Sequence, residues 1–189
     1  CNLACDYCTI TPAMRARALA PAALLAAMRQ GRALDYDRIA FTGGEPTIRR
    51  DLVSLIKAAR SLGFVDLKLQ SNGLLFTPAN VARLVEAGIS RFHVSIHAHR
   101  PEAYDALVRR PGSFPAMELG LRAAVDSGLP VIVDAIVKTD TYRELPAAMH
   151  WIADRGVHEV HLWYVSLTDG NRDNHASLPA MRDALPSMR

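Results

Sequence analysis

DRIAFTGGEPT, residues 37–47, carries the local pattern that decides the fold: a short apolar run, a glycine turn, and the start of a helix. Runs of strand length, each bounded by Gly, Pro, Asp or Asn, occur at 37–42, 65–71, 91–97, 131–138 and 158–166. Between them, apolar residues at helical spacing predict helices at 19–30, 51–61, 78–87, 116–127 and 142–155. Strands that alternate with helices of this length predict consecutive βαβ units and one parallel sheet.

Glycines mark the ends of the predicted helices. Each stands just past a helical segment, where a left-handed residue is favoured: Gly31, Gly63, Gly88, Gly128 and Gly156. The helix at 19–30 comes before the first visible strand, so we expect a further strand upstream of Cys1 and six βα steps in all. We therefore interpret residues 1–189 as one domain of a longer chain.

Composition indicates an ordinary globular domain. The 189 residues are 50% hydrophobic and 22% charged, and the net charge of +3 is too small to indicate a nucleic-acid partner. No apolar run reaches the length of a membrane span, and we expect no signal peptide before Cys1. All three cysteines lie within residues 1–8, a pattern typical of metal ligands in a reducing compartment, so we expect a cytoplasmic protein.

Four polar segments follow the predicted strands. In a parallel sheet or barrel, chemistry sits at the carboxyl ends of the strands. We therefore expect these segments to meet at one edge: the cysteine loop 1–8, TGGEPT at 42–47, SNG at 71–73 and SIHAH at 95–99.

The cysteine spacing indicates a metal centre. Cys1, Cys5 and Cys8 have the spacing C-x3-C-x2-C, and three thiolates so close together can bind three irons of a cubane cluster and leave the fourth iron open. The alternative is a zinc site whose fourth ligand is His97 or His99.

CNLACDYC resembles the CxxxCxΦC motif of the radical S-adenosylmethionine (radical SAM) superfamily, with Tyr7 at the aromatic position. The second hallmark of that family, a GGEP turn after the second strand, is matched by Gly43-Gly44-Glu45-Pro46. The resemblance covers essentially the whole chain. It implies a partial (β/α)6 TIM-like barrel that lacks its first strand here, and it favours the iron–sulfur cluster over zinc.

The resemblance also implies an activity. Cys1, Cys5 and Cys8 would bind a [4Fe–4S] cluster, and S-adenosylmethionine would chelate its open iron. Reductive cleavage of that cofactor would give a 5′-deoxyadenosyl radical that abstracts hydrogen from a peptide or a small-molecule intermediate. The electron would come from an external reductant of the flavodoxin or ferredoxin type.

Further site residues follow from the same family motifs. Gly43 and Gly44, which lack a Cβ atom, would let the backbone approach the cofactor, and Pro46 belongs to the same cofactor-binding turn. Glu45 would hold the ammonium of the methionyl group, or it could serve only as a carboxylate at a helix N-terminus. Residues 71–73 read as a turn, and the resemblance makes Ser71 and Asn72 possible cofactor contacts.

The strand at 91–97 alternates apolar and polar residues, so His93, Ser95, His97 and His99 should share the face opposite Phe92. By resemblance Ser95 would contact the cofactor. His97 would contact cofactor or substrate or donate a proton; alternatively, it is a neutral histidine bound to neighbouring backbone.

Asp134, midway along a predicted buried strand, would reach substrate or form a buried pair with a neighbour such as Lys68. His97 and Asp134 are thus the catalytic candidates. Trp163 and Tyr164 should point in opposite directions, and either one stacks on adenine or both pack in the core. The polar loop 169–174 is expected to be a rim or lid element.

Three other interpretations fit parts of the sequence. His97-Ala98-His99 also occurs in metal-dependent barrel hydrolases, but His161, a possible further ligand, falls near the start of its strand, at the wrong end. An iron–sulfur electron-transfer module would have no need of the GGEP turn. A nucleic-acid-modifying radical SAM enzyme is disfavoured by the nearly balanced charge.

The segment 101–114 resembles a superfamily branch that includes peptide maturases, haem-pathway enzymes and molybdopterin-precursor cyclases.

Overall fold

A computed structural model describes residues 1–10, 12–15, 18–138 and 141–165. The predicted loop 169–174 lies outside these residues. Five parallel strands form one sheet in the order β1-β2-β3-β4-β5. They are β1 (Arg38–Phe41), β2 (Asp66–Ser71), β3 (Arg91–Ser95), β4 (Val131–Val137) and β5 (Glu159–Tyr164). The predicted α/β fold with a parallel sheet is confirmed; the strand expected upstream of Cys1 lies outside this sequence and stays a prediction.

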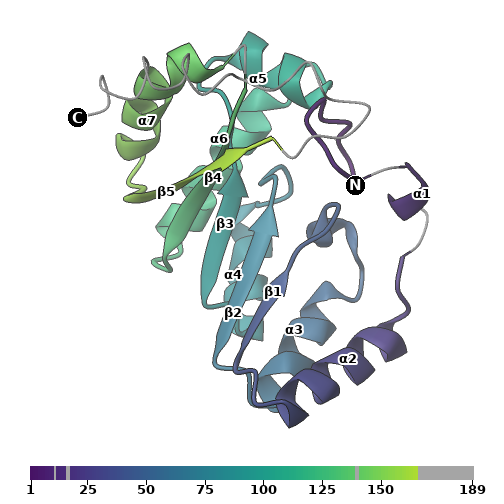
Figure 1. Ribbon diagram of the computed structural model, residues 1–189. Coiled ribbons are helices and arrows are strands. Elements are labelled where there is room, and N and C mark those ends of the chain that lie inside the picture. Colours follow the sequence, from purple (N-terminus) through teal and green to yellow (C-terminus); the bar gives the residue numbers. More distant parts are fainter. Residues whose placement is uncertain (11, 16–17, 139–140, 166–189) are drawn as a thin grey trace.

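Helices connect successive strands and lie along the sheet (Figure 1). They are α1 (Pro12–Arg15), α2 (Pro21–Ala33), α3 (Leu52–Ser61), α4 (Pro78–Ala87), α5 (Pro101–Val108), α6 (Phe114–Asp126) and α7 (Leu145–Ala153), with short 3-10 turns η1 (Pro46–Ile48) and η2 (Tyr142–Glu144). Among the helices of the described residues, none is long and apolar enough to cross a membrane.

The core forms where the helices pack on one face of the sheet. Leu67 and Leu69 of β2 and Phe92 and Val94 of β3 are fully buried, as the alternation predicted. Burying side chains of this size stabilises the fold by roughly 1.5–3 kcal/mol each. The polar residues of β3 therefore face the other side of the sheet, which in a barrel is the lumen.

Most of the predicted helix ends agree with the structure, but Gly31 does not. Gly63, Gly88, Gly128 and Gly156 have positive φ angles between 77° and 116°. Gly31 instead lies inside α2, which continues to Ala33, and the positive-φ residue that follows the helix is Asp35 (φ 62°). A Cβ atom on Gly31 would lie 3.7 Å from Phe64, an ordinary contact, so this glycine neither ends the helix nor is required by close packing.

Two other helical regions differ from expectation. The predicted helix at 142–155 is divided, because α7 begins at Leu145 and carries a proline in its first turn, a position where a missing N–H is harmless. Helix α5 was not predicted from the sequence. It ends on Arg109, a non-glycine residue at φ 53°, so the usual glycine stop signal is absent.

Candidate functional site

The cysteine loop, residues 1–8, lies at the end of the sheet toward which the arrowheads of β2 and β3 point (Figure 1). Its backbone is held by α5: the N–H of Ala4 donates to the carbonyl of Val108 at 3.3 Å, and that of Asp6 to Leu107 at 3.0 Å. The helix that was not predicted from the sequence is therefore part of the support for the loop.

Two other segments also hold this loop. Lys138, one residue past β4, donates from Nζ to Asp6 Oδ2 at 2.6 Å, and its side chain is only 1% exposed. Asn72 Nδ2, in the turn after β2, donates to Asn2 Oδ1 at 2.8 Å. Segments far apart in the sequence therefore meet at one edge, as the rule for parallel strands predicts.

The three cysteines are free thiols, with Cys1 exposed and Cys5 and Cys8 partly buried. Burial raises the pKa of Cys5, although a hydrogen bond with Tyr7 opposes that change. Among the described residues, only one group of three metal-binding side chains has its ligand atoms within 4.8 Å of one another, and it contains no cysteine. Zinc–sulfur bonds of about 2.3 Å would place tetrahedral sulfurs about 3.8 Å apart. The three cysteine sulfurs are therefore not all as close together as in a zinc site.

The GGEP turn packs directly on the first cysteine. A Cβ atom on Gly44 would lie 3.3 Å from Cys1 Cβ and 3.4 Å from Cys1 N, so a side chain there would press on the cysteine. Gly43 has a φ of 129°, which residues with a side chain rarely adopt. The two glycines therefore allow the turn and the cysteine loop to approach each other.

Glu45 is 4% exposed and accepts hydrogen bonds from both sides of the turn. Oε1 accepts from the Thr47 N–H at 3.0 Å, from Thr47 Oγ1 at 2.6 Å and from Ser71 Oγ at 2.8 Å. Oε2 accepts from the Asn72 N–H at 2.8 Å. Glu45 therefore does cap the short helix η1, as the simpler interpretation proposed, but its carboxylate also joins the turns after β1 and β2.

Residues 71–73 form the predicted turn and belong to the same hydrogen-bond network. The Gly73 N–H donates to Ser71 Oγ at 3.0 Å, and the Leu74 N–H donates to Asn72 Oδ1 at 3.1 Å. Both side chains thus shape the turn and also position groups outside it, Glu45 in one case and Asn2 in the other.

His97 is a buried, neutral histidine. Its Nδ1 accepts the N–H of Ile136 at 3.0 Å, so the proton is on Nε2. Burial lowers the pKa of His97 to about 3. The ring meets that of Tyr7 edge-on, with 4.5 Å between ring centroids, and Nε2 has no hydrogen-bond partner among the described residues. The backbone-bound interpretation is right for Nδ1, while Nε2 keeps a donor for a bound molecule.

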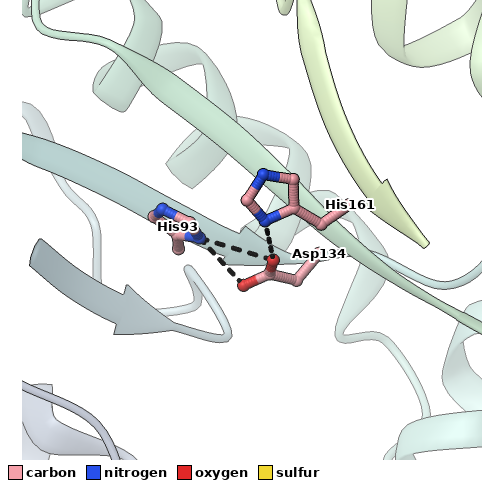
Figure 2. A group of neighbouring side chains, drawn as sticks. All are labelled: His93, Asp134 and His161. Carbon is pink, nitrogen blue, oxygen red and sulfur yellow. Dashed lines mark hydrogen bonds and ion pairs between the residues drawn. The ribbon is translucent and has the colours of Figure 1, made fainter. Parts of the chain in front are cut away.

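Asp134 has other partners than the predicted Lys68. Its carboxylate lies 3.2 Å from His93 Nδ1 and 3.4 Å from His161 Nδ1 (Figure 2). It also accepts a hydrogen bond from Trp163 Nε1 at 3.1 Å. Burial raises the pKa of Asp134, but the hydrogen bonds outweigh it, and the net pKa lies below its usual value. The prediction of a Lys68 pair is wrong because the register sets Asp134 beside β5 rather than β2.

The sequence pattern placed His93 on the correct face but did not connect it to Asp134 or His161. Only the strand register, which pairs Ser95 with Asp134 and Asp134 with His161, brings them together. Trp163 donates to Asp134 and is half-exposed, as is Tyr164, so core packing does not describe either ring.

An apolar cavity of about 630 Å³ adjoins the cysteine loop. Cys1, Gly43, Gly44 and Glu45 line one part of it, and side chains of α2, β1, α3 and the neighbouring loops line the rest. The site residues at this edge therefore border a space large enough for a small molecule.

Comparisons with known proteins agree with this geometry. The sequence model of the radical SAM superfamily matches residues 1–152. The chain is 33% identical over 156 residues to a probable GTP 3′,8-cyclase of Methanopyrus kandleri, covering 82% of this chain and 50% of that protein. It is 31% identical over 183 residues to the GTP 3′,8-cyclase of Petrotoga mobilis, covering 90% and 56%. The chain thus spans about half the length of these curated relatives.

Solved structures share the fold at low sequence identity. The structure described as native anSMEcpe with bound AdoMet and Kp18Cys peptide superposes with a TM-score of 0.84 at 16% identity, covering 100% of this chain and 56% of that one. Streptococcus suis SuiB bound to S-adenosylmethionine gives 0.78 at 15% identity, covering 98% and 44%. The chain therefore belongs to the radical SAM superfamily, whose members use a [4Fe–4S] cluster and S-adenosylmethionine.

Proposed function

We propose that residues 1–189 form the core of an enzyme that acts on a small molecule by radical SAM chemistry. When bound, the cluster and S-adenosylmethionine supply one-electron cleavage of a C–S bond and a 5′-deoxyadenosyl radical that removes a hydrogen atom from substrate. The observation that carries the proposal is the packing of Gly44 against Cys1, which joins the two hallmark motifs in one site.

We assign the cluster to the thiolates of Cys1, Cys5 and Cys8. Their loop donates backbone hydrogen bonds to α5 and accepts side-chain hydrogen bonds from Asn72 and Lys138, so the loop is already ordered before a cluster binds. Tyr7, on the same loop, lies between the thiol of Cys5 and the ring of His97 and would limit access of water to the cluster.

The GGEP turn would bind the methionyl part of the cofactor. Gly43 and Gly44 give its backbone room to approach, and Pro46 begins the short helix that fixes the turn. The carboxylate of Glu45 is held in place by Ser71 and Asn72 and would accept the ammonium group.

Two residues near the end of β3 complete the proposed site. Ser95, the last residue of the strand, is half-buried and would donate to the cofactor. His97 offers its buried Nε2–H to an acceptor on cofactor or substrate. Because His97 is neutral, it donates this hydrogen bond without adding a charge to the site.

Among small molecules, a purine nucleotide is the first substrate to test. The support is the similarity to proteins named GTP 3′,8-cyclase, at 29–33% identity over most of this chain. The peptide-bound neighbours are only 16% identical and support the fold alone. As in the family generally, an external one-electron donor, of the flavodoxin or ferredoxin type, would reduce the cluster.

The test uses the full-length protein, with its cluster reconstituted and reduced without oxygen. We expect GTP to increase the formation of 5′-deoxyadenosine. Glu45→Gln should weaken S-adenosylmethionine binding roughly 10- to 100-fold, because a hydrogen bond to a charged group is worth about 1.5–3 kcal/mol. Glu86→Gln, on the outer side of α4, is the matched control and should leave binding unchanged.

The outcomes separate the parts of the proposal. Cleavage that ignores GTP would reject the nucleotide and keep the radical chemistry. A loaded cluster without any cleavage of S-adenosylmethionine would favour an electron-transfer module. Cleavage stimulated by a nucleic acid or a peptide would assign the substrate to that class instead.

A further inference from the structure

Three neighbouring strands each contribute one side chain to a second cluster of metal-binding groups. His93 comes from β3, Asp134 from β4 and His161 from β5, and their ligand atoms all lie within 4.8 Å of one another (Figure 2). This cluster, called here the His–Asp–His cluster, shares no residue with the cysteine loop or the GGEP turn. His93 and Asp134 are buried, while the side chain of His161 is 39% exposed.

The hydrogen-bond roles at His161 are inconsistent for a neutral ring. Its Nε2 lies 2.7 Å from Glu159 Oε1 and its Nδ1 lies 3.4 Å from Asp134 Oδ1. Ionised carboxylates only accept hydrogen bonds, and a neutral imidazole has a single N–H to donate. If that N–H serves Glu159, a lone pair on Nδ1 faces the oxygen of Asp134. A proton on Nδ1, or a metal ion bound to it, would each satisfy this contact with Asp134.

The distances favour a metal cation over a proton. Asp134 oxygens lie 3.2 and 3.4 Å from His93 Nδ1 and 3.4 Å from His161 Nδ1. Charge-assisted hydrogen bonds are usually about 2.7–2.9 Å long. Ligand atoms about 2.0–2.1 Å from a tetrahedral zinc ion are instead about 3.4 Å apart. The two edges that meet at Asp134 therefore match those of a coordination polyhedron, and the edge between the two histidines is no longer than 4.8 Å.

The surroundings resemble the outer shell of a metal site. Metal-binding histidines usually donate their other N–H to a carboxylate, and ligating carboxylates are themselves hydrogen-bonded. The carboxylate of Glu159 lies at His161 Nε2 in this way, and Trp163 Nε1 donates to Asp134 Oδ1 at 3.1 Å. These contacts fix the orientation of two of the three ligands.

We propose that the His–Asp–His cluster binds a divalent transition-metal ion of the Zn²⁺ type through His93 Nδ1, the Asp134 carboxylate and His161 Nδ1. Two imidazoles and one carboxylate suit Zn²⁺ and Fe²⁺. Three protein ligands leave one coordination position for a further molecule, as in catalytic zinc sites. The partial exposure of His161 provides the entry path. The open position would take an oxygen or nitrogen atom of a small molecule.

The experiment measures zinc in the full-length, cluster-loaded protein after dialysis against trace Zn²⁺, together with X-ray absorption at the zinc edge. We expect one zinc ion per chain with only nitrogen and oxygen neighbours at about 2.0–2.1 Å. His161→Gln should lose at least tenfold in zinc affinity, and the exposed His158→Gln is the matched control that should lose none.

Glu159→Gln provides a second variant that changes only an exposed residue and no proposed ligand. Loss of this orienting carboxylate should weaken zinc binding roughly 10- to 100-fold without changing the melting temperature of the zinc-free protein. The proposal is overturned if the wild type retains no zinc, if the zinc has sulfur neighbours near 2.3 Å, or if His161→Gln binds zinc as tightly as the wild type. None of these results depends on S-adenosylmethionine cleavage.

Discussion

Replacing Gly120 with alanine should disturb the proposed cofactor site from the opposite side of the sheet. Gly120 lies in α6, and a Cβ atom there would stand 2.0 Å from the carbonyl oxygen of Gly73, whereas real Cβ atoms almost never come closer than 3.0 Å. The two backbones must therefore separate by about 1 Å. Gly73 belongs to the same turn as Ser71 and donates its N–H to Ser71 Oγ, so this displacement reaches the hydrogen bond between Ser71 and Glu45, now 2.8 Å long.

The magnitude follows from two opposed effects. Alanine raises helix propensity by about 1 kcal/mol over glycine. Overpacking a tight contact costs about 1–3 kcal/mol, and this cost outweighs the gain in propensity because the contact is with backbone that cannot rotate away. We expect Gly120→Ala to lower the free energy of unfolding by up to about 2 kcal/mol. It should weaken S-adenosylmethionine binding roughly tenfold, as expected for a lost bond to a charged group.

Gly31→Ala is the matched control, because Gly31 is also a helical glycine but its added Cβ would meet only Phe64, at an ordinary 3.7 Å. It should be neutral or stabilising by up to about 1 kcal/mol. Chemical denaturation measures stability, and equilibrium binding to the reduced, cluster-loaded protein measures affinity. If Gly120→Ala proves as stable as Gly31→Ala and binds the cofactor normally, the tight packing of α6 on the turn is not what holds the site.

Two further predictions concern buried ionisable side chains. The pKa of His97 is about 3 in the folded protein and about 6.5 when unfolded, so its contribution to stability is complete above pH 6.5 and is lost as the pH falls toward 3. The free energy of unfolding should change by at most about 1.4 kcal/mol per pH unit because of this residue. In denaturation curves measured between pH 6 and 4, His97→Gln should reduce this dependence on pH. A dependence that is unchanged in the variant would contradict the buried neutral ring. Lys138→Met should lower the free energy of unfolding by roughly 1–3 kcal/mol, which is less than for a fully buried pair because Asp6 is 21% exposed. The same variant should lose its cluster faster in air. Arg122→Met, which breaks an exposed pair with Asp126, is its control and should change stability by less than about 0.5 kcal/mol, so equal effects of the two variants would refute the anchoring role of Lys138.

The sheet could be read from the sequence because its signals are local. The run at 65–71 alternates apolar and polar residues between Gly63 and Gly73, and the run at 131–138 is largely apolar and β-branched and follows Pro130. The observed strands begin and end within one residue of these runs. The helix α4 matches its predicted bounds, since Thr77 caps its start and Gly88 its end. The convergence of the cysteine loop with the turn after β2 follows from the direction of parallel strands alone.

The remaining features depend on contacts that local patterns do not encode. The glycine at position 31 was assigned wrongly because α2 continues past it to Ala33, and a non-glycine residue, Asp35, takes the positive φ angle instead. The partners of Asp134 depend on the register of three strands, and a shift of one residue would have pointed His93 or His161 to the other face. The four hydrogen bonds to Glu45 likewise join residues up to 27 positions apart.

The most direct test of the proposed function is electron paramagnetic resonance of the full-length protein, with its cluster reconstituted anaerobically and reduced with dithionite, before and after addition of S-adenosylmethionine. We predict a reduced [4Fe–4S] signal that changes when the cofactor is added and that is lost in the Cys1→Ala, Cys5→Ala, Cys8→Ala triple variant. A cluster signal that ignores S-adenosylmethionine would contradict the enzymatic proposal and favour electron transfer. If the wild type forms no cluster, the interpretation of the cysteine loop as a zinc site would be favoured instead.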